Sequence, residues 1–223
     1  CSSDLGAGPE KSFGANIRLP WEQNANPIIS NDSKLITFKY FFTRKLTFVR
    51  HSDAITLFPG GFGTLDEGYE ALTLMQTGKA KLMPLVLIDK PGGTYWKTWN
   101  QHVREHLLRN GLISPDDCDL YHIAEDVESA VRYIVRFYRN YHSMRFVRDL
   151  LVIRIKNASS ASAIRALNED FKDIVTKGDI RQIEPTQDEK DDNAYLQLPR
   201  LGFEFNKKDY GRLRQFIDVI NTI

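Results

Sequence analysis

The clearest chemical signal in the sequence is the glycine-rich segment 58–67, which reads FPGGFGTLDE. It follows an apolar run and opens a predicted helix, so its backbone N–H groups would form a cradle for an anion. Three glycines in four residues would let the backbone take positive φ angles and approach a ligand closely. The segment has neither the Gly-Lys-Ser/Thr ending of a P-loop nor the glycine spacing of a dinucleotide fingerprint. We therefore expect a phosphate site on the turn Gly60–Thr64, with a plain strand–helix connection as the alternative.

Glu67 has two interpretations that the sequence alone leaves open. Thr64 and Glu67 have the spacing of a capping box, in which Thr64 is the N-cap and Glu67 reaches back to its N–H. A helix N-terminus also keeps a nearby carboxylate ionised. An ionised carboxylate beside the turn would be suited to stabilise an oxocarbenium-like sugar or to orient an attacking water.

Arg44 lies in the middle of a helix predicted over residues 33–51 and is followed by Lys45. The residues three and four positions away are mostly aromatic or polar, so this face of the helix is not a plain solvated stripe. A guanidinium group there suits a forked contact with a phosphate or a carboxylate. The alternative is an arginine whose stem packs on the helix while its charged end reaches water.

Together these residues resemble a known family. The pair Arg44-Lys45 precedes the motif Pro-Gly-Gly-x-Gly-Thr-x-x-Glu, and every fixed position of that motif is matched at 59–67. The combination is similar to the Lonely Guy (LOG) family, whose members have often carried the label "lysine decarboxylase". The resemblance covers about residues 8–140, and residues 149–223 are similar to the extra segment of larger bacterial members.

The resemblance implies an activity and a set of residue roles. It implies a Rossmann-like homodimer that hydrolyses nucleoside 5′-monophosphates to free base and ribose 5-phosphate, without a cofactor or a metal. The larger bacterial relatives act on purine or pyrimidine monophosphates rather than on cytokinin precursors. On this resemblance Arg44 and Glu67 are catalytic, and the substrate or its phosphate is bound by Lys45, Pro59, Gly60, Gly61, Phe62, Gly63 and Thr64. The main alternative is a non-catalytic nucleotide or cofactor carrier on the same fold, in which Glu67 is only a cap.

The segments around these motifs alternate between strand and helix with short connections, which is typical of a parallel α/β sheet. Apolar runs predict strands at 12–18, 54–58, 84–88 and 120–123. Periodic segments predict helices at 33–51, 64–76, 95–109 and 126–141. We expect residues 1–148 to form a Rossmann-like α/β domain that begins partway through its fold, because its first strand–turn–helix unit and the family's N-terminal strands are absent from this chain.

The character of the sequence changes after Arg148. Patterns predict a strand at 150–155, a helix at 162–177, strand residues within 195–205 and a final helix at 208–220. The acidic run 184–193, EPTQDEKDDN, is typical of a linker or loop. We expect residues 149–223 to form a small α+β C-terminal extension.

Composition narrows the classes of partner. The formal net charge is +1, so no global field would steer nucleic acid or an anionic membrane to the protein. There are two cysteines, and no apolar run approaches the ~20 residues that span a bilayer. We therefore expect a cytoplasmic protein that binds neither nucleic acid nor membrane. The aromatic segment 33–51 predicts burial in a two-fold interface, and hence a homodimer or a higher homo-oligomer.

Two weaker patterns point elsewhere. His102 and His106 complete the order H-x-x-E-H of an inverted zinc-protease motif, but no third ligand follows and the segment is typical of an ordinary amphipathic helix. Arginines with interleaved aromatic residues recur from Arg132 to Arg148, at a spacing that favours a solvated face or a site for an anionic effector over nucleic-acid binding. A pyridoxal enzyme would need a lysine at a recognisable cofactor site, and nothing around Lys45 indicates one.

Overall fold

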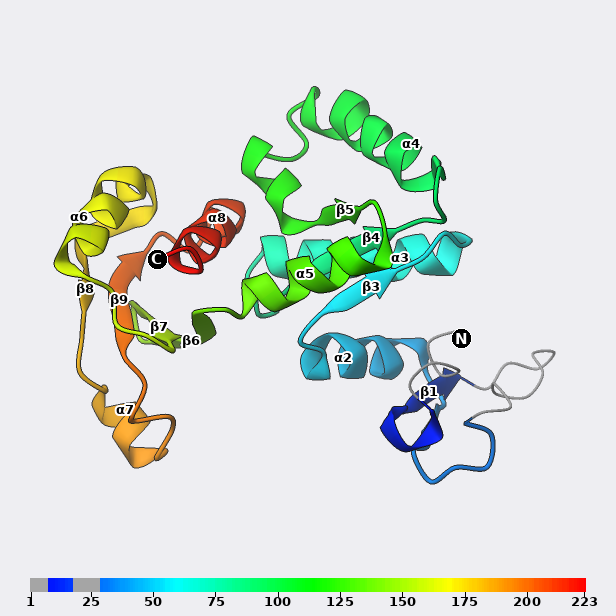
Figure 1. Cartoon of the computed structure of the whole chain (residues 1–223), viewed down its shortest axis with the longest axis horizontal. Helices are drawn as coiled ribbons and strands as arrows, with labels where there is room; N and C mark the ends of the chain where they lie inside the picture. Colours follow the sequence, from blue (N-terminus) through cyan, green and yellow to red (C-terminus); the bar gives the residue numbers. More distant parts are fainter. Residues whose placement is uncertain (1–7, 18–28) are drawn as a thin grey trace. The chain divides into compact units, whose positions relative to one another are not determined.

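The computed structural model describes residues 8–17 and 29–223, and Figure 1 labels its elements. The chain divides into two compact units, Cys1–Ser52 and Asp53–Ile223, which are taken in turn below. Parallel strands joined by helices are followed by one antiparallel sheet. The α/β class and the Rossmann-like character expected from the sequence are confirmed.

In the first unit, two short strands pair in parallel and one helix follows them (Figure 1). The elements are the 3-10 helix η1 at Pro9–Lys11, β1 at Gly14–Ile17, β2 at Leu35–Phe38 and α2 at Phe41–His51. β1 is the strand predicted at 12–18, whose last residue, Arg18, lies outside the described residues.

The single helix predicted over 33–51 is wrong in its first part. Residues 35–38 form β2 instead, and α2 begins only at Phe41, after Tyr40 in an extended conformation. Ile36 and Thr37 are β-branched and favour a strand, and pairing with β1 satisfies the backbone N–H and carbonyl groups of this segment.

The second unit opens with a parallel sheet in the order β3-β4-β5. The strands are β3 at Ile55–Leu57, β4 at Leu85–Ile88 and β5 at His122–Ala124. Every residue of β4 is buried, as expected for a strand that is covered on both faces. The three predicted strands are present, the last displaced slightly toward the C-terminus.

Helices connect these strands and cover the sheet (Figure 1). α5 packs Ala130 against Val86, Ile88 and Ala124 of the sheet. The predicted helices are present, although the segment 95–109 changes from α-helix to π-helix and the helix predicted at 126–141 ends earlier. The elements are α3 at Phe62–Gln76, α4 at Tyr95–His102, the π-helix η2 at Val103–Leu108, the 3-10 helix η3 at Pro115–Leu120 and α5 at Val127–Phe137.

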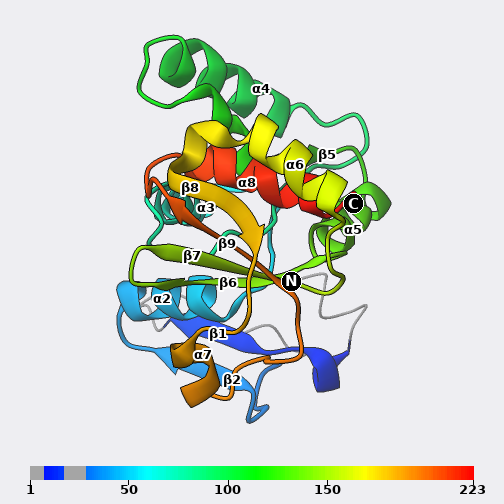
Figure 2. The ribbon, with the colours of Figure 1, turned by 90° about the vertical axis from the view of Figure 1, so that its left-hand side faces the viewer.

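An antiparallel sheet in the order β6-β7-β9-β8 completes the second unit (Figure 2). The strands are β6 at Tyr141–Val147, β7 at Leu150–Ile155, β8 at Val175–Gln182 and β9 at Arg200–Phe205. The helices are α6 at Ala161–Asp170, η4 at Lys172–Ile174, α7 at Gln187–Asp191 and α8 at Tyr210–Ile220.

The structure of this region differs from the sequence-based expectations at two places. The helix predicted at 162–177 is too long, because α6 ends at Asp170 and β8 begins at Val175. β6 lies before residue 148 and pairs with β7 across a short turn, so the antiparallel sheet begins at Tyr141. The division into domains 1–148 and 149–223 stays a prediction.

The acidic run 184–193 is not a linker, contrary to the prediction. It contains α7, where the hydroxyl of Thr186 accepts the backbone N–H of Glu189. Glu189 is fully buried, and its carboxylate lies 2.8 Å from Nε of Arg154 and 3.7 Å from Arg200. Burial acts to raise the pKa of Glu189, but hydrogen bonds from Thr186 and Arg154 and the charge of Arg200 hold that pKa below its usual value. The run therefore supplies a buried anion that two arginines neutralise.

α8 packs against the parallel-sheet part of the same unit. Seven of its eleven residues are buried, and the helix contacts η3 and α3. A Cβ added to Gly211 would lie 2.3 Å from the backbone carbonyl oxygen of Asp116, so only glycine permits this approach. The guanidinium of Arg214 donates a hydrogen bond of 2.7 Å to the hydroxyl of Tyr133. α8 is therefore firmly packed against the helices that flank the parallel sheet.

Candidate functional site

The glycine-rich turn lies between β3 and α3, at the carboxyl end of a parallel strand. Open α/β sheets place their ligands at this edge. α3 begins at Phe62 with Gly61 as its N-cap, and the N–H groups of Thr64 and Leu65 both reach the carbonyl of Gly61, at 3.1 and 3.3 Å. The N–H groups of Phe62 and Gly63 precede any acceptor within the helix, so they are suited to bind an anion.

The start of α3 bears on the capping box predicted for Thr64 and Glu67. Because α3 begins two residues earlier than expected, Thr64 is not the N-cap, and no side chain caps the helix. The capping box of Thr64 and Glu67 is therefore wrong. Glu67 lies in the second turn of α3 and is half-buried. Its spacing of three residues from Thr64 puts both side chains on the same face of the helix.

The glycines act differently from the prediction. None of Gly60, Gly61 and Gly63 has a positive φ angle, and Gly61 has a φ of −83°. The glycines instead differ in the space around them. A Cβ on Gly60 would lie 2.2 Å from Oγ1 of Thr64. A Cβ on Gly61 or Gly63 would meet no atom within 4 Å. Gly60 therefore lets Thr64 fold over the turn, and the other two leave the backbone open to a ligand.

Two residues that sequence reasoning missed hold the turn in place. The hydroxyl of Tyr95 donates a hydrogen bond of 2.7 Å to the carbonyl of Gly60. The carboxylate of Asp89, directly after β4, accepts the backbone N–H of Tyr95 at 3.0 Å. Both follow the next parallel strand and so lie at the same edge of the sheet, which is the signal that would have identified them.

The flanks of the turn expose aromatic side chains. Phe62 has 94% of its surface exposed and Phe58 has 56%. Side chains of this size are usually buried, so their exposure beside a backbone cradle is suited to contact a planar group of a ligand. Pro59 is also exposed.

Comparison with known proteins identifies the family. The family described as "possible lysine decarboxylase" matches residues 6–134, more than half of the chain. The matched residues include Arg44, Lys45, the whole glycine turn and Glu67. The chain belongs to this family, the LOG family. No curated protein matches the chain.

Membership of the LOG family supports an enzymatic role of the phosphoribohydrolase type at family level. In this LOG protein Gly60 and Thr64 lie close together at the start of α3, and Glu67 follows in the second turn of the same helix. Arg44 and Lys45 lie on α2 in the first unit, where both are half-buried. The guanidinium carbon of Arg44 lies 5.5 Å from the ring centroid of Phe48, a cation–π contact on its own helix.

The two weaker sequence patterns, the histidine pair and the arginine run, both lie within the described residues. The rings of His102 and His106 lie 5.0 Å apart, yet within residues 8–17 and 29–223 no three metal-ligating side chains gather in one place. Arg132 pairs with Glu128 and Arg145 with Asp192, as expected for a solvated face. No helix in the described part of the chain is long and apolar enough to cross a membrane.

Proposed function

We propose that this LOG protein hydrolyses the N-glycosidic bond of a nucleoside 5′-monophosphate and releases free base and ribose 5-phosphate. The observation that carries the proposal is the open backbone turn Gly60–Thr64 with Glu67 one helical turn along the same face of α3. An open backbone turn and a carboxylate at the N-terminal end of one helix would support this reaction. The matched family supports the same type of chemistry.

In this proposal the turn binds the 5′-phosphate. The N–H groups of Phe62 and Gly63 and the dipole of α3 contribute about half a positive charge. A phosphate dianion requires a full cation as well, and Arg44, with Lys45 beside it, supplies a forked contact to the phosphate or the ribose. Pro59 and Phe62 border the cradle and limit the ways a nucleotide can enter.

Glu67 then acts on the sugar. As the bond between C1′ and the base nitrogen breaks, positive charge develops on C1′ and the ring oxygen, and an ionised carboxylate stabilises it. Water adds to C1′, its proton is released, and the departing base takes up a proton. Water thus supplies both the hydroxyl group that bonds to C1′ and the proton that the base takes up.

The test is incubation of the protein with purine, pyrimidine and cytokinin-type monophosphates, followed by separation of base and ribose 5-phosphate. We expect both products in equal amounts from at least one monophosphate, and much slower release from the matching nucleoside. A protein that binds monophosphates but releases no base would be a carrier, and the proposed reaction would be wrong.

We also propose that two copies of the protein pair through α2. Within the described residues this helix buries only Val49, while Phe41, Phe42 and Leu46 have more than half of their surfaces exposed. An exposed apolar face of this kind is typical of an interface, and most soluble homo-oligomers are two-fold dimers.

A further inference from the structure

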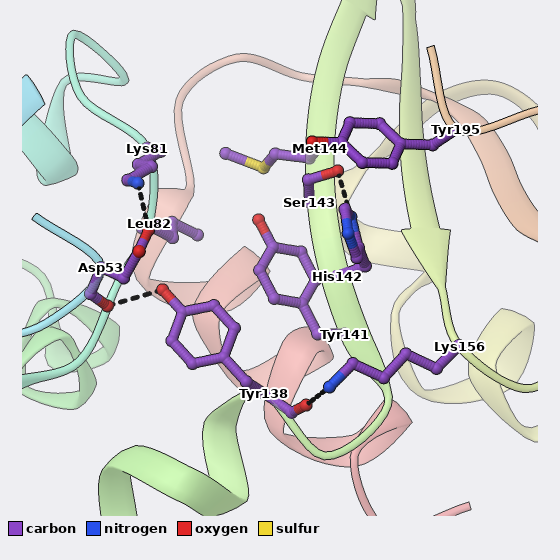
Figure 3. Close-up of a pocket in the computed structure, with 10 residues that line it drawn as sticks. All are labelled: Asp53, Lys81, Leu82, Tyr138, Tyr141, His142, Ser143, Met144, Lys156 and Tyr195. Carbon is purple, nitrogen blue, oxygen red and sulfur yellow. Dashed lines mark hydrogen bonds and ion pairs between the residues drawn. The ribbon is translucent and has the colours of Figure 1, made fainter. Parts of the chain in front are cut away.

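A cavity of about 500 Å³ lies in the second unit (Figure 3), and its lining includes no residue of the glycine turn. Its walls come from the residues before β3 and β4, the end of α5, the start of β6, and single residues near β7 and β9. The volume falls within the range of small-molecule sites. Asp53 precedes β3 and Lys81 precedes β4, so the cavity lies at the amino edge of the parallel sheet, whereas the glycine turn lies at the carboxyl edge.

Aromatic rings line this cavity. The rings of His142 and Tyr195 lie 4.5 Å apart, and those of Tyr138 and Tyr141 lie 6.2 Å apart. Tyr141 is almost fully buried, and Figure 3 shows its hydroxyl pointing into the cavity toward Leu82 and Met144. Rings that converge on an open space favour a planar aromatic ligand, which gains both buried area and ring–ring contact.

The charges around the cavity favour an anion. Lys81 pairs with Asp53 at 2.6 Å, which leaves that pair neutral. Lys156 donates to the backbone carbonyl of Tyr138, and within residues 8–17 and 29–223 no carboxylate pairs with it. Its ammonium charge is therefore not balanced by a carboxylate among these residues, and it lies beside Tyr138 in the lining of the cavity.

The remaining polar groups add no negative charge. Burial lowers the pKa of His142, and the positive charges of Arg154 and Lys156 lower it further, which favours the neutral imidazole. Its Nδ1 lies 2.9 Å from the hydroxyl of Ser143, which also accepts a hydrogen bond from Arg154. The hydroxyl of Tyr138 donates to the carbonyl of Asp53 at 2.6 Å.

We propose that this cavity binds a planar aromatic molecule that carries one anionic group, a carboxylate or a phosphate. The ring lies against Tyr195 and His142, and the anionic group lies at Lys156. Most of the lining residues lie beyond the family-matched span 6–134, so this site is separate from the proposed reaction.

The first measurement uses matched small probes and the ring-proton NMR signals of His142, assigned by comparison with His142→Gln. 4-Hydroxybenzoate tests the carboxylate source, with 4-hydroxybenzamide as the neutral planar control and cyclohexanecarboxylate as the non-planar anion. 5′-AMP tests the phosphate source, with adenosine as its neutral control. We expect at least one planar anion to shift the His142 signals saturably at millimolar concentration, and the controls to shift them far less.

The second measurement uses variants of exposed residues. Lys156→Gln removes the excess charge and should weaken binding about tenfold or more. Tyr195→Leu removes a ring and should weaken it about threefold to tenfold. Lys208→Gln, an exposed lysine outside the cavity, should change nothing.

The proposal is overturned if neither planar anion shifts the His142 signals, if neutral and anionic probes bind equally, or if Lys156→Gln binds as tightly as the original protein. Because the readout lies at the amino edge of the sheet, these outcomes are independent of base release at the glycine turn. The aromatic carboxylate also carries no ribose, so it tests the cavity even if the proposed hydrolysis is wrong.

Discussion

α2 and α8 are each eleven residues long, but they bury very different shares of their surfaces. α8 buries seven residues, including Phe216, Ile217 and the charged Arg214. α2 buries only Val49 among the described residues and exposes several large apolar side chains. α8 is therefore covered by the rest of its own chain, whereas α2 exposes an apolar face, which a second copy would cover in the proposed dimer.

The contrast extends to the regions around the two helices. The family-matched region has strands of three or four residues and a glycine turn whose residues 60–63 are exposed. The C-terminal sheet has strands of six to eight residues and buries an ion-pair cluster. We infer that substitutions in the first region change activity or assembly, and those in the second change stability.

The largest effect is expected from Glu189→Gln in α7. The substitution keeps the volume but leaves Arg154 and Arg200 buried without their anion, which costs about 3–5 kcal/mol of unfolding free energy. Chemical denaturation would measure this loss. Asp188→Asn, on the exposed side of the same helix, is the matched control and should change stability by less than about 0.5 kcal/mol.

Glu189 also makes the stability of the protein depend on pH. Because the pKa of Glu189 is lowered in the folded protein, its contribution to stability is complete above the unfolded-state pKa of about 4.3 and is lost as pH falls through the folded-state value. Glu189→Gln should therefore reduce the difference in stability between pH 7 and pH 3. If the difference in stability between the two pH values is unchanged, Glu189 does not contribute to the loss of stability in acid.

The next effect is expected from Glu67→Gln in α3. Turnover of a nucleoside monophosphate should fall by about 10²-fold or more, because the amide cannot stabilise positive charge on the sugar. Binding and melting temperature should change little. Asp66→Asn, the exposed neighbouring carboxylate, is the control. Retained turnover with a lower melting temperature would make Glu67 a structural residue and break the contrast between the two regions.

Arg44→Lys should have a somewhat smaller effect on activity. Lysine keeps the charge but loses the fork, so kcat/KM for the monophosphate should fall by roughly 2–3 kcal/mol, or about 30- to 150-fold. The ratio of kcat/KM for the nucleotide to kcat/KM for the nucleoside should be smaller in the variant. Arg50→Lys, exposed on the same helix, should behave like the original protein. Equal proportional losses on both substrates would assign Arg44 to the sugar or to the fold.

The smallest expected effect is on the mass of the protein in solution, which reports its oligomeric state. We expect light scattering at micromolar concentration to give a dimer, and Leu46→Glu on the exposed face of α2 to reduce the mass by a factor of about two. Leu112→Glu, a leucine of similar exposure in the second unit, is the control. A monomeric original protein would mean that α2 is not the interface.

The sequence predicted the parts of this fold whose signals are local. The buried strands β3 and β4 and the turn between β3 and α3 were predictable, because apolar runs, glycines and a helix start lie within a few residues of one another. β2 was missed because its strand identity depends on β1, which lies some twenty residues earlier, and on its own it merges with the aromatic helix that follows.

The candidate site, too, was predictable only where its signals are local in the sequence. Residue types gave the glycine turn and Glu67, but the start of α3 and the φ angles of the glycines depend on how Tyr95 and Thr64 pack around Gly60. The burial of Glu189 depends on Arg154, a residue 35 positions away. The spacing of Thr186 and Glu189 is a capping box, and it was the one local signal that the acidic run is a helix.

The close contact at Gly211 bears on how the sequence can drift over evolutionary time. Any side chain at this position would collide with the backbone of Asp116, and no change of side chain at residue 116 can relieve a collision with its carbonyl. A single mutation at residue 116 therefore cannot compensate for a side chain at position 211. Among descendants of this chain, position 211 should stay glycine for as long as the C-terminal helix is retained, and should diverge freely once that helix is lost. A glycine at position 211 would thus indicate the lineages in which the C-terminal helix still packs against the segment around Asp116.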